Sequence, residues 1–193
     1  MTRFYAQATN DFTYPEDDCT PSAPRTIGAP DRLPGQLIPP HFETHQIACR
    51  ELLANPDEIL RIASSHFYKL ETVCWAAKAG ILATGYYMGA QRESFLVTRP
   101  NPEDWARPVP ISVHHQLLPR SRGNTSDKPS WRYEPPCVGA WPLIIGQAHT
   151  ASHLFFIDGQ WDALALIDVM GWTPLPDHVA IIAFRGATNW RKL

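Results

Sequence analysis

The chain has 193 residues, of which 44% are hydrophobic and 11% aromatic, enough for one domain of ordinary size with a substantial core. Its formal net charge of −2 excludes a uniformly basic nucleic-acid-binding protein, so contacts with phosphates would have to come from a local patch. The sequence has no run of about eighteen apolar residues and no apolar segment at its amino terminus. We therefore expect a cytoplasmic protein without a membrane span.

The common metal and phosphate motifs that can be recognised from local sequence are absent. His41 and His45 have helical spacing, but the glutamate between them is misplaced for an HExxH metalloprotease motif. No GxxxxGK[ST] loop occurs, which excludes a P-loop segment. The four cysteines, Cys19, Cys49, Cys74 and Cys137, form no CxxC pair. This spacing argues against a zinc ribbon and against a disulfide framework, and we expect reduced thiols.

The beginning of the chain differs in composition from the rest. Residues 1–42 are rich in proline, carry mixed charges and show little periodicity. Such a composition predicts a flexible leader, which either joins the domain to another component or packs on its surface as an extended arm.

Residues 43–80 predict a small helical region. A first helix is expected over residues 43–54. Asn55 has the character of an N-cap for a second helix, because proline follows at the first helical position and glutamate at the third. A third helix is expected over residues 69–79, where apolar residues recur at helical spacing and Gly80 provides a stop.

From residue 81 the hydrophobic period changes to that of strands. Residues 81–150 therefore predict a strand-rich subdomain, in which His114 and His115 of one strand would point to opposite faces. A polar, basic loop that contains Trp131 and Tyr133 interrupts it. The expected strands and apolar elements cover residues 81–88, 93–99, 110–118 and 139–146.

The segment that follows predicts a parallel crossover. An apolar strand from His153 ends in Asp158-Gly159, a helix covers residues 160–171, and a second strand covers residues 178–184. Four consecutive apolar residues in the first strand indicate burial on both faces.

Asp158 and Asp162 are the residues of this segment that could carry chemistry. Asp158 ends the strand and Asp162 lies in the first helical turn, at the carboxyl edge of the sheet where open α/β folds bind ligands. Two converging carboxylates suit Mg²⁺ and its bound phosphates. The alternative is structural: Asp158 caps the helix, and Asp162 complements the helix dipole.

The motif DGQWDALAL, followed by AFRGATNW, resembles the Toprim domain of bacterial and phage primases, topoisomerases and some nucleases, with the primase branch most similar. In that family a glutamate-glycine pair ends the strand and an aspartate-alanine pair begins the helix. Asp158-Gly159 and Asp162-Ala163 occupy these places, so the glutamate is replaced by a residue one methylene shorter. Arg185-Gly186 resembles the small-residue turn after the family's second strand.

The sequence upstream is similar to the strand-rich subdomain that precedes Toprim in the primase core. The resemblance implies that basic and aromatic residues here, with Arg185, contact template or nucleotide phosphates and stack on bases. These residues are Arg120, Arg122, Lys128, Arg132 and Tyr133. The expected fold is α/β: a partial, Rossmann-like Toprim sheet in residues 151–193, preceded by the strand-rich subdomain and the small helical region.

The function implied by the resemblance is that of a DNA primase-type nucleotidyltransferase of phage or mobile-element replication. It would synthesise RNA primers from nucleotides on single-stranded DNA, with Asp158 and Asp162 as catalytic and metal-binding residues for Mg²⁺ or Mn²⁺. A replicative helicase is a further expected partner.

The sequence departs from the family in two ways. No zinc-binding module precedes the core, and the family's later DxD pair does not occur before Leu193. A complete two-metal site would then require a second chain. Two alternatives stay open: a non-catalytic module that binds single-stranded nucleic acid or nucleotides, and a fragment whose missing strands come from elsewhere. An exposed sheet edge near residues 179–184 would favour the fragment.

Overall fold

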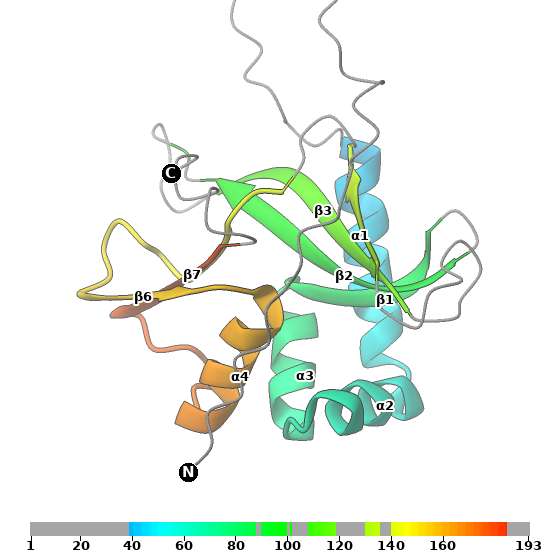
Figure 1. The fold of residues 1–193 in the computed structure, drawn as a ribbon, viewed down its shortest axis with the longest axis horizontal. Helices are drawn as coiled ribbons and strands as arrows, with labels where there is room; N and C mark the ends of the chain where they lie inside the picture. The colour runs from blue at the N-terminus through cyan, green and yellow to red at the C-terminus, as the bar shows by residue number, and fades with distance from the viewer. Residues whose placement is uncertain are drawn as a thin grey trace, which may run out of the picture. The chain divides into compact units, whose positions relative to one another are not determined.

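The computed structural model describes residues 39–87, 90–99, 101, 108–118, 130–135 and 140–184. Within these residues the chain forms a mixed α/β fold of four helices and two sheets (Figure 1). None of the described helices is long and apolar enough to cross a membrane.

The three predicted amino-terminal helices are present as α1 (Pro39–Leu53), α2 (Pro56–His66) and α3 (Leu70–Lys78). Helix α1 begins inside the stretch predicted as leader, since its two prolines lie in the first turn, where a missing backbone N–H costs no helical hydrogen bond. Asn55 caps α2 as expected, because its side-chain oxygen accepts the Glu58 N–H at 3.2 Å.

The strand-rich region forms an antiparallel sheet of β1 (Leu82–Tyr87), β2 (Ala90–Arg99), β3 (Val109–Leu117) and β4 (Ser130–Glu134), in that order. Strand β4 lies in the stretch predicted as a loop, so that prediction was wrong. Its central residues alternate between an exposed Arg132 and a buried Tyr133, a half-buried strand pattern that the surrounding polar sequence conceals.

The second sheet contains β5 (Leu143–Ile145), β6 (His153–Ile157) and β7 (Val179–Ala183), in the order β5-β7-β6. Strands β6 and β7 are parallel and are connected through α4 (Gln160–Met170), so the parallel pairing of the predicted strand-helix-strand unit is confirmed.

The burial of these two strands differs from the prediction. Strand β7 is buried at every residue, whereas β6 is an edge strand with no neighbour on its outer side among the described residues. Leu154 and Phe156 of β6 are 43% and 59% exposed. The apolar sequence of β6 therefore does not reflect burial on both faces.

The four-stranded sheet has helices on both faces. Side chains of residues that are paired in register lie on the same face. Ala83 and Ser94 are paired, and Ala83 packs against Ala48 and Cys49 of α1, so this face carries α1. Leu82 and Phe95 are paired on the opposite face, which carries the main core.

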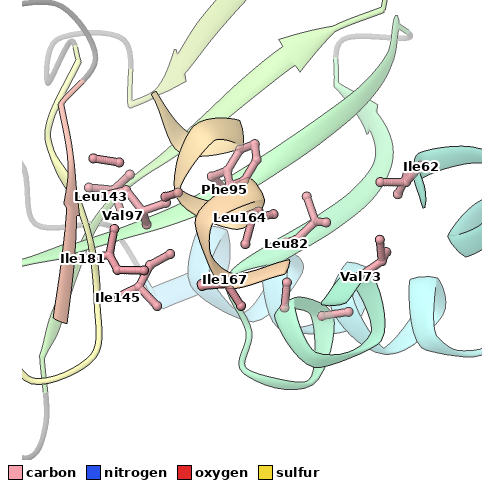
Figure 2. Close-up of a cluster of buried hydrophobic side chains, with 14 of the residues drawn as sticks. Ile62, Val73, Leu82, Phe95, Val97, Leu143, Ile145, Leu164, Ile167 and Ile181 are labelled. Atoms are coloured by element: carbon pink, nitrogen blue, oxygen red, sulfur yellow. The ribbon is translucent and has the colours of Figure 1, made fainter. Parts of the chain in front are cut away.

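One hydrophobic cluster joins α2, α3 and α4 to both sheets. Figure 2 shows Leu164 and Ile167 of α4 between Ile181 of β7 and Leu82 of β1. The regions predicted as separate subdomains therefore share one core. Its labelled members in Figure 2 are Ile62, Val73, Leu82, Phe95, Val97, Leu143, Ile145, Leu164, Ile167 and Ile181.

Candidate functional site

The candidate site is the acidic turn between β6 and α4. Asp158 directly follows the last residue of β6, and Asp162 lies in the first turn of α4. A Cβ on Gly159 would lie 2.9 Å from Asp162 Oδ2, so glycine leaves the room that this carboxylate occupies. Both aspartates are exposed, at the edge of the sheet where the sequence predicted them.

Asp158 does not cap α4. The N-cap residue is Gly159, and no side chain accepts a hydrogen bond at this cap. This removes the capping half of the structural alternative, while Asp162 still has the position that complements the helix dipole. The two carboxylates stand at the helix N-terminus without a hydrogen bond or an ion pair to any described residue.

The beginning of α4 is fixed to the four-stranded sheet by two polar contacts. Gln160 Nε2 lies 2.9 Å from Nδ1 of His114 on β3, and both side chains are buried. The indole N–H of Trp161 donates to Gln116 Oε1 on the same strand. Because Gln160 and Trp161 lie two and three residues after Asp158, β3 sets the position of the acidic turn.

Aromatic residues also pack against the start of α4. The Trp161 ring stacks on His66 with centroids 3.7 Å apart and meets Phe95 edge-on at 4.8 Å. The Tyr68 hydroxyl donates to the Trp161 carbonyl at 2.6 Å. Burial raises the pKa of Tyr68, and the nearby carboxylates of Asp162, Asp168 and Glu93 raise it further, which keeps this hydroxyl protonated as a donor.

A third carboxylate, Glu93, lies on the same face of the sheet but is already paired. It is 2% exposed, accepts from Arg61 at 2.9 Å and lies 3.5 Å from His66 Nε2. In the part of the chain that the structure describes, no group of three or more His, Cys, Asp or Glu residues could hold a metal ion. The described donor set of the acidic turn is thus two carboxylates.

The predicted basic and aromatic residues fall into two groups. Arg132 is exposed on β4, where its guanidinium donates to the Trp131 carbonyl at 2.9 Å. Tyr133 points to the other face and is buried, with its ring edge-on to His114 at 4.8 Å. The His114 side chain thus contacts both Tyr133 and Gln160, but the Tyr133 ring is buried. The remaining predicted contact residues lie outside the described residues: Arg120, Arg122, Lys128 and Arg185.

Sequence analysis missed the residues that position the acidic turn. His114 and Gln116 lie on β3, and each is buried with a polar partner at the start of α4. Their signal in the sequence is a polar residue at a core position of a strand, which requires a hydrogen-bonding partner. The predicted opposite orientation of His114 and His115 is confirmed, because they contact opposite faces of the sheet.

A second polar cluster lies on the opposite face, under α1. His115 contacts Arg92 and Ser94 through Nδ1 and Glu134 through Nε2, the last at 3.0 Å. Nearby, His45 of α1 donates to the Gly80 carbonyl at 3.0 Å. Burial lowers the pKa of His45 to about 4, the charges of His115 and Arg92 lower it too, and the hydrogen bond to Gly80 opposes them.

Comparison with known proteins adds no relative. No family model matches the chain, and neither a curated protein nor a solved structure matches it. The resemblance to Toprim primases therefore depends on the sequence motifs alone.

Proposed function

We propose that the chain is a primase-like Toprim protein of DNA replication, which synthesises RNA primers on single-stranded DNA once its metal site is complete. The observation that carries this proposal is the acidic turn: a parallel strand ends directly before Asp158, and Asp162 stands in the next helical turn. Both carboxylates are exposed at the carboxyl edge of the sheet, where ligands of open α/β folds bind.

The donor set fits a single Mg²⁺ or Mn²⁺. Magnesium is commonly held by one or two carboxylates together with substrate phosphates and water, which two exposed aspartates satisfy. Asp158 and Asp162 would hold the ion, and the ion would neutralise charge on the nucleotide phosphates. The chain's own contribution is to hold both carboxylates at a fixed turn through Gln160 and Trp161.

Primer synthesis tests the proposal. Purified protein is incubated with circular single-stranded DNA, labelled ribonucleotides, and Mg²⁺ or Mn²⁺, and short products are resolved on a denaturing gel. We expect metal-dependent primers from the parent chain and roughly a hundredfold less product from Asp158→Ala, a loss comparable to that of one hydrogen-bond donor that stabilises transition-state charge, about two to three orders of magnitude in rate.

Two further variants make the assay specific. Asp177→Ala removes an exposed aspartate outside the turn and should leave the yield unchanged. Asp158→Glu restores the reach of the family's glutamate and should keep or raise the yield. Folded parent protein that makes no product with either metal, with or without this glutamate, would refute primase activity for this chain.

Strand β6 shows where a complete site could gain a further strand. Its outer edge has no neighbour among the described residues, and its exposed Leu154 and Phe156 favour coverage by protein. The edge expected at residues 179–184 is not there, because β7 is paired on both sides. A second chain would therefore add beside β6, next to Asp158.

A second candidate function is binding of single-stranded nucleic acid or nucleotides without catalysis. The described donor set of only two carboxylates favours it, because nucleotidyl transfer by two metals needs more ligands. This function predicts salt-sensitive binding of a labelled oligonucleotide that is unchanged in Asp158→Ala and weakened when Arg132 is replaced with Gln.

A further inference from the structure

A cavity of about 400 Å³ opens at the other end of the second sheet. Its walls come from the end of α3, the end of β2, the turn after β5 and the loop before β7. Gly146, in the turn after β5, lines it, whereas Asp158 follows the opposite end of the parallel strands. The cavity is thus separate from the acidic turn.

The backbone at Gly146 forms part of the cavity wall and requires glycine. Gly146 has φ +87°, and a Cβ there would lie 2.6 Å from the Val179 carbonyl, so no other residue fits without moving the strand. The volume lies in the range of small-molecule sites, about 300–1,000 Å³, which are mainly apolar with a few polar groups that fix orientation.

The described lining is mainly apolar, and its polar side chains are those of Thr98, Arg99, Gln147 and His149. Trp75, Ile144 and Leu175 provide broad apolar and aromatic surface. Arg99 and Thr98, at the end of β2, add a guanidinium and a hydroxyl, and both residues are half-buried. Arg99 has no hydrogen bond or ion pair to any described residue, and no Asp or Glu is among the described lining residues.

These features define the chemistry of an occupant. A half-buried guanidinium that has no carboxylate beside it among the described residues attracts an anion and forms charge-assisted hydrogen bonds with it. A single such group is too little for a nucleic-acid strand, whose affinity depends on several phosphate contacts. An apolar wall with one tryptophan fits a flat ring system.

We propose that this cavity is a binding site for a small molecule with a flat apolar body and one anionic group, a carboxylate or a phosphate ester. Arg99 binds the anionic group, and the surface around Trp75 covers the ring. The site goes beyond the proposed primer synthesis and does not depend on it.

A fluorescent dye of this chemistry tests the site. 8-Anilinonaphthalene-1-sulfonate is titrated into the full chain, and its neutral relative N-phenyl-1-naphthylamine is titrated in parallel. We expect saturable one-to-one binding of the sulfonate dye. Arg99→Gln should weaken its binding at least tenfold and change binding of the neutral dye less than twofold, because only the sulfonate contacts the guanidinium. Arg50→Gln, which removes an exposed arginine on α1, is the matched control and should bind both dyes as the parent does.

A blocking variant locates the dye. Thr98→Trp places an indole in the cavity and should abolish binding of both dyes while the circular dichroism spectrum stays that of the parent. Unchanged dye binding in Thr98→Trp, equal affinities in Arg99→Gln and the parent, or non-saturable binding would each overturn the proposal. Competition by 1-naphthoate and 1-naphthyl phosphate then shows whether a carboxylate or a phosphate is preferred, and displacement by neither would also contradict it.

Discussion

Single buried polar side chains determine much of the local structure around both faces of the first sheet. Glu93 accepts from the Arg61 guanidinium and lies 3.5 Å from His66 Nε2, and its burial is tolerated because these partners replace water. His45 is different: its Nε2 bonds the Gly80 carbonyl, while its Nδ1 has no hydrogen-bond partner among the described atoms. A neutral imidazole satisfies this arrangement, whereas a second N–H would be buried without an acceptor.

His45 should make the stability of the protein depend on pH. Its pKa is about 4 in the folded chain against 6.5 for the free side chain, so the unfolded state takes up the proton first. Stability should fall as the pH drops from about 6.5 to about 4, by at most about 3 kcal/mol from this residue. Urea unfolding at pH 7 and pH 4.5 measures the loss.

His45→Gln should reduce that loss, because glutamine keeps an N–H donor for Gly80 and does not titrate. His178→Gln, at an exposed position, is the matched control. If His45→Gln and His178→Gln lose the same stability as the parent between the two pH values, the assignment to His45 is wrong.

Sequence analysis identified Asp158 and Asp162 because their chemistry depends only on local order: a strand, a turn and a helix. It could not identify the partners His114 and Gln116, because the pairing with Gln160 and Trp161 joins positions about 45 residues apart and depends on how α4 docks on β3. Local motifs predict which groups are present, and tertiary packing decides which of them meet.

At the scale of elements, α4 is fixed at both ends. Its first turn is bound to β3 through Gln160 and Trp161. Near its other end, the Asp168 carboxylate accepts the Lys69 N–H at 2.8 Å and the Thr72 hydroxyl at 2.6 Å, which caps the start of α3. Movement of the acidic turn therefore requires loss of buried polar contacts.

The Gln160–His114 contact can be tested as a pair. Gln160→Leu leaves His114 buried without this partner and should destabilise the chain by about 1–3 kcal/mol, and His114→Leu should do the same to Gln160. The double variant replaces both with apolar groups and should be less destabilising than the sum of the two. Thermal or urea unfolding of all four chains closes the cycle, and strict additivity would show that the two side chains do not interact.

The sequence predicted those helices and strands whose hydrophobic pattern is local. It failed where the existence or the burial of a strand depends on its position in the sheet. The helices and most strands follow hydrophobic period and capping, as Asn55 shows at α2. The burial of β6 depends on its place at an edge, and β4 depends on pairing with β3, so neither could be deduced from composition.

At the scale of the whole domain, the helical region, the strand-rich region and the parallel crossover share one core. Members of α3, both sheets and α4 belong to the same buried cluster. A Toprim-like segment that folds independently of the upstream strands would need a core of its own, and Leu164 and Ile167 instead pack in the common one (Figure 2). The described domain should therefore unfold as one cooperative unit.

Leu164→Ala tests this cooperativity. Leu164 is fully buried in the centre of the cluster, and its truncation should cost about 2–5 kcal/mol, the range for a leucine removed from a close-packed core. Val169→Ala on the same helix removes an exposed side chain and should change stability by less than about 0.5 kcal/mol. Far-ultraviolet circular dichroism reports helices and strands together, whereas tryptophan fluorescence reports the seven tryptophans of the chain, among them Trp75 in α3, Trp131 in β4 and Trp161 in α4. If the core is common, the urea midpoints from both signals shift together in Leu164→Ala. A separate early transition of one signal would instead show that the described domain does not unfold as one cooperative unit.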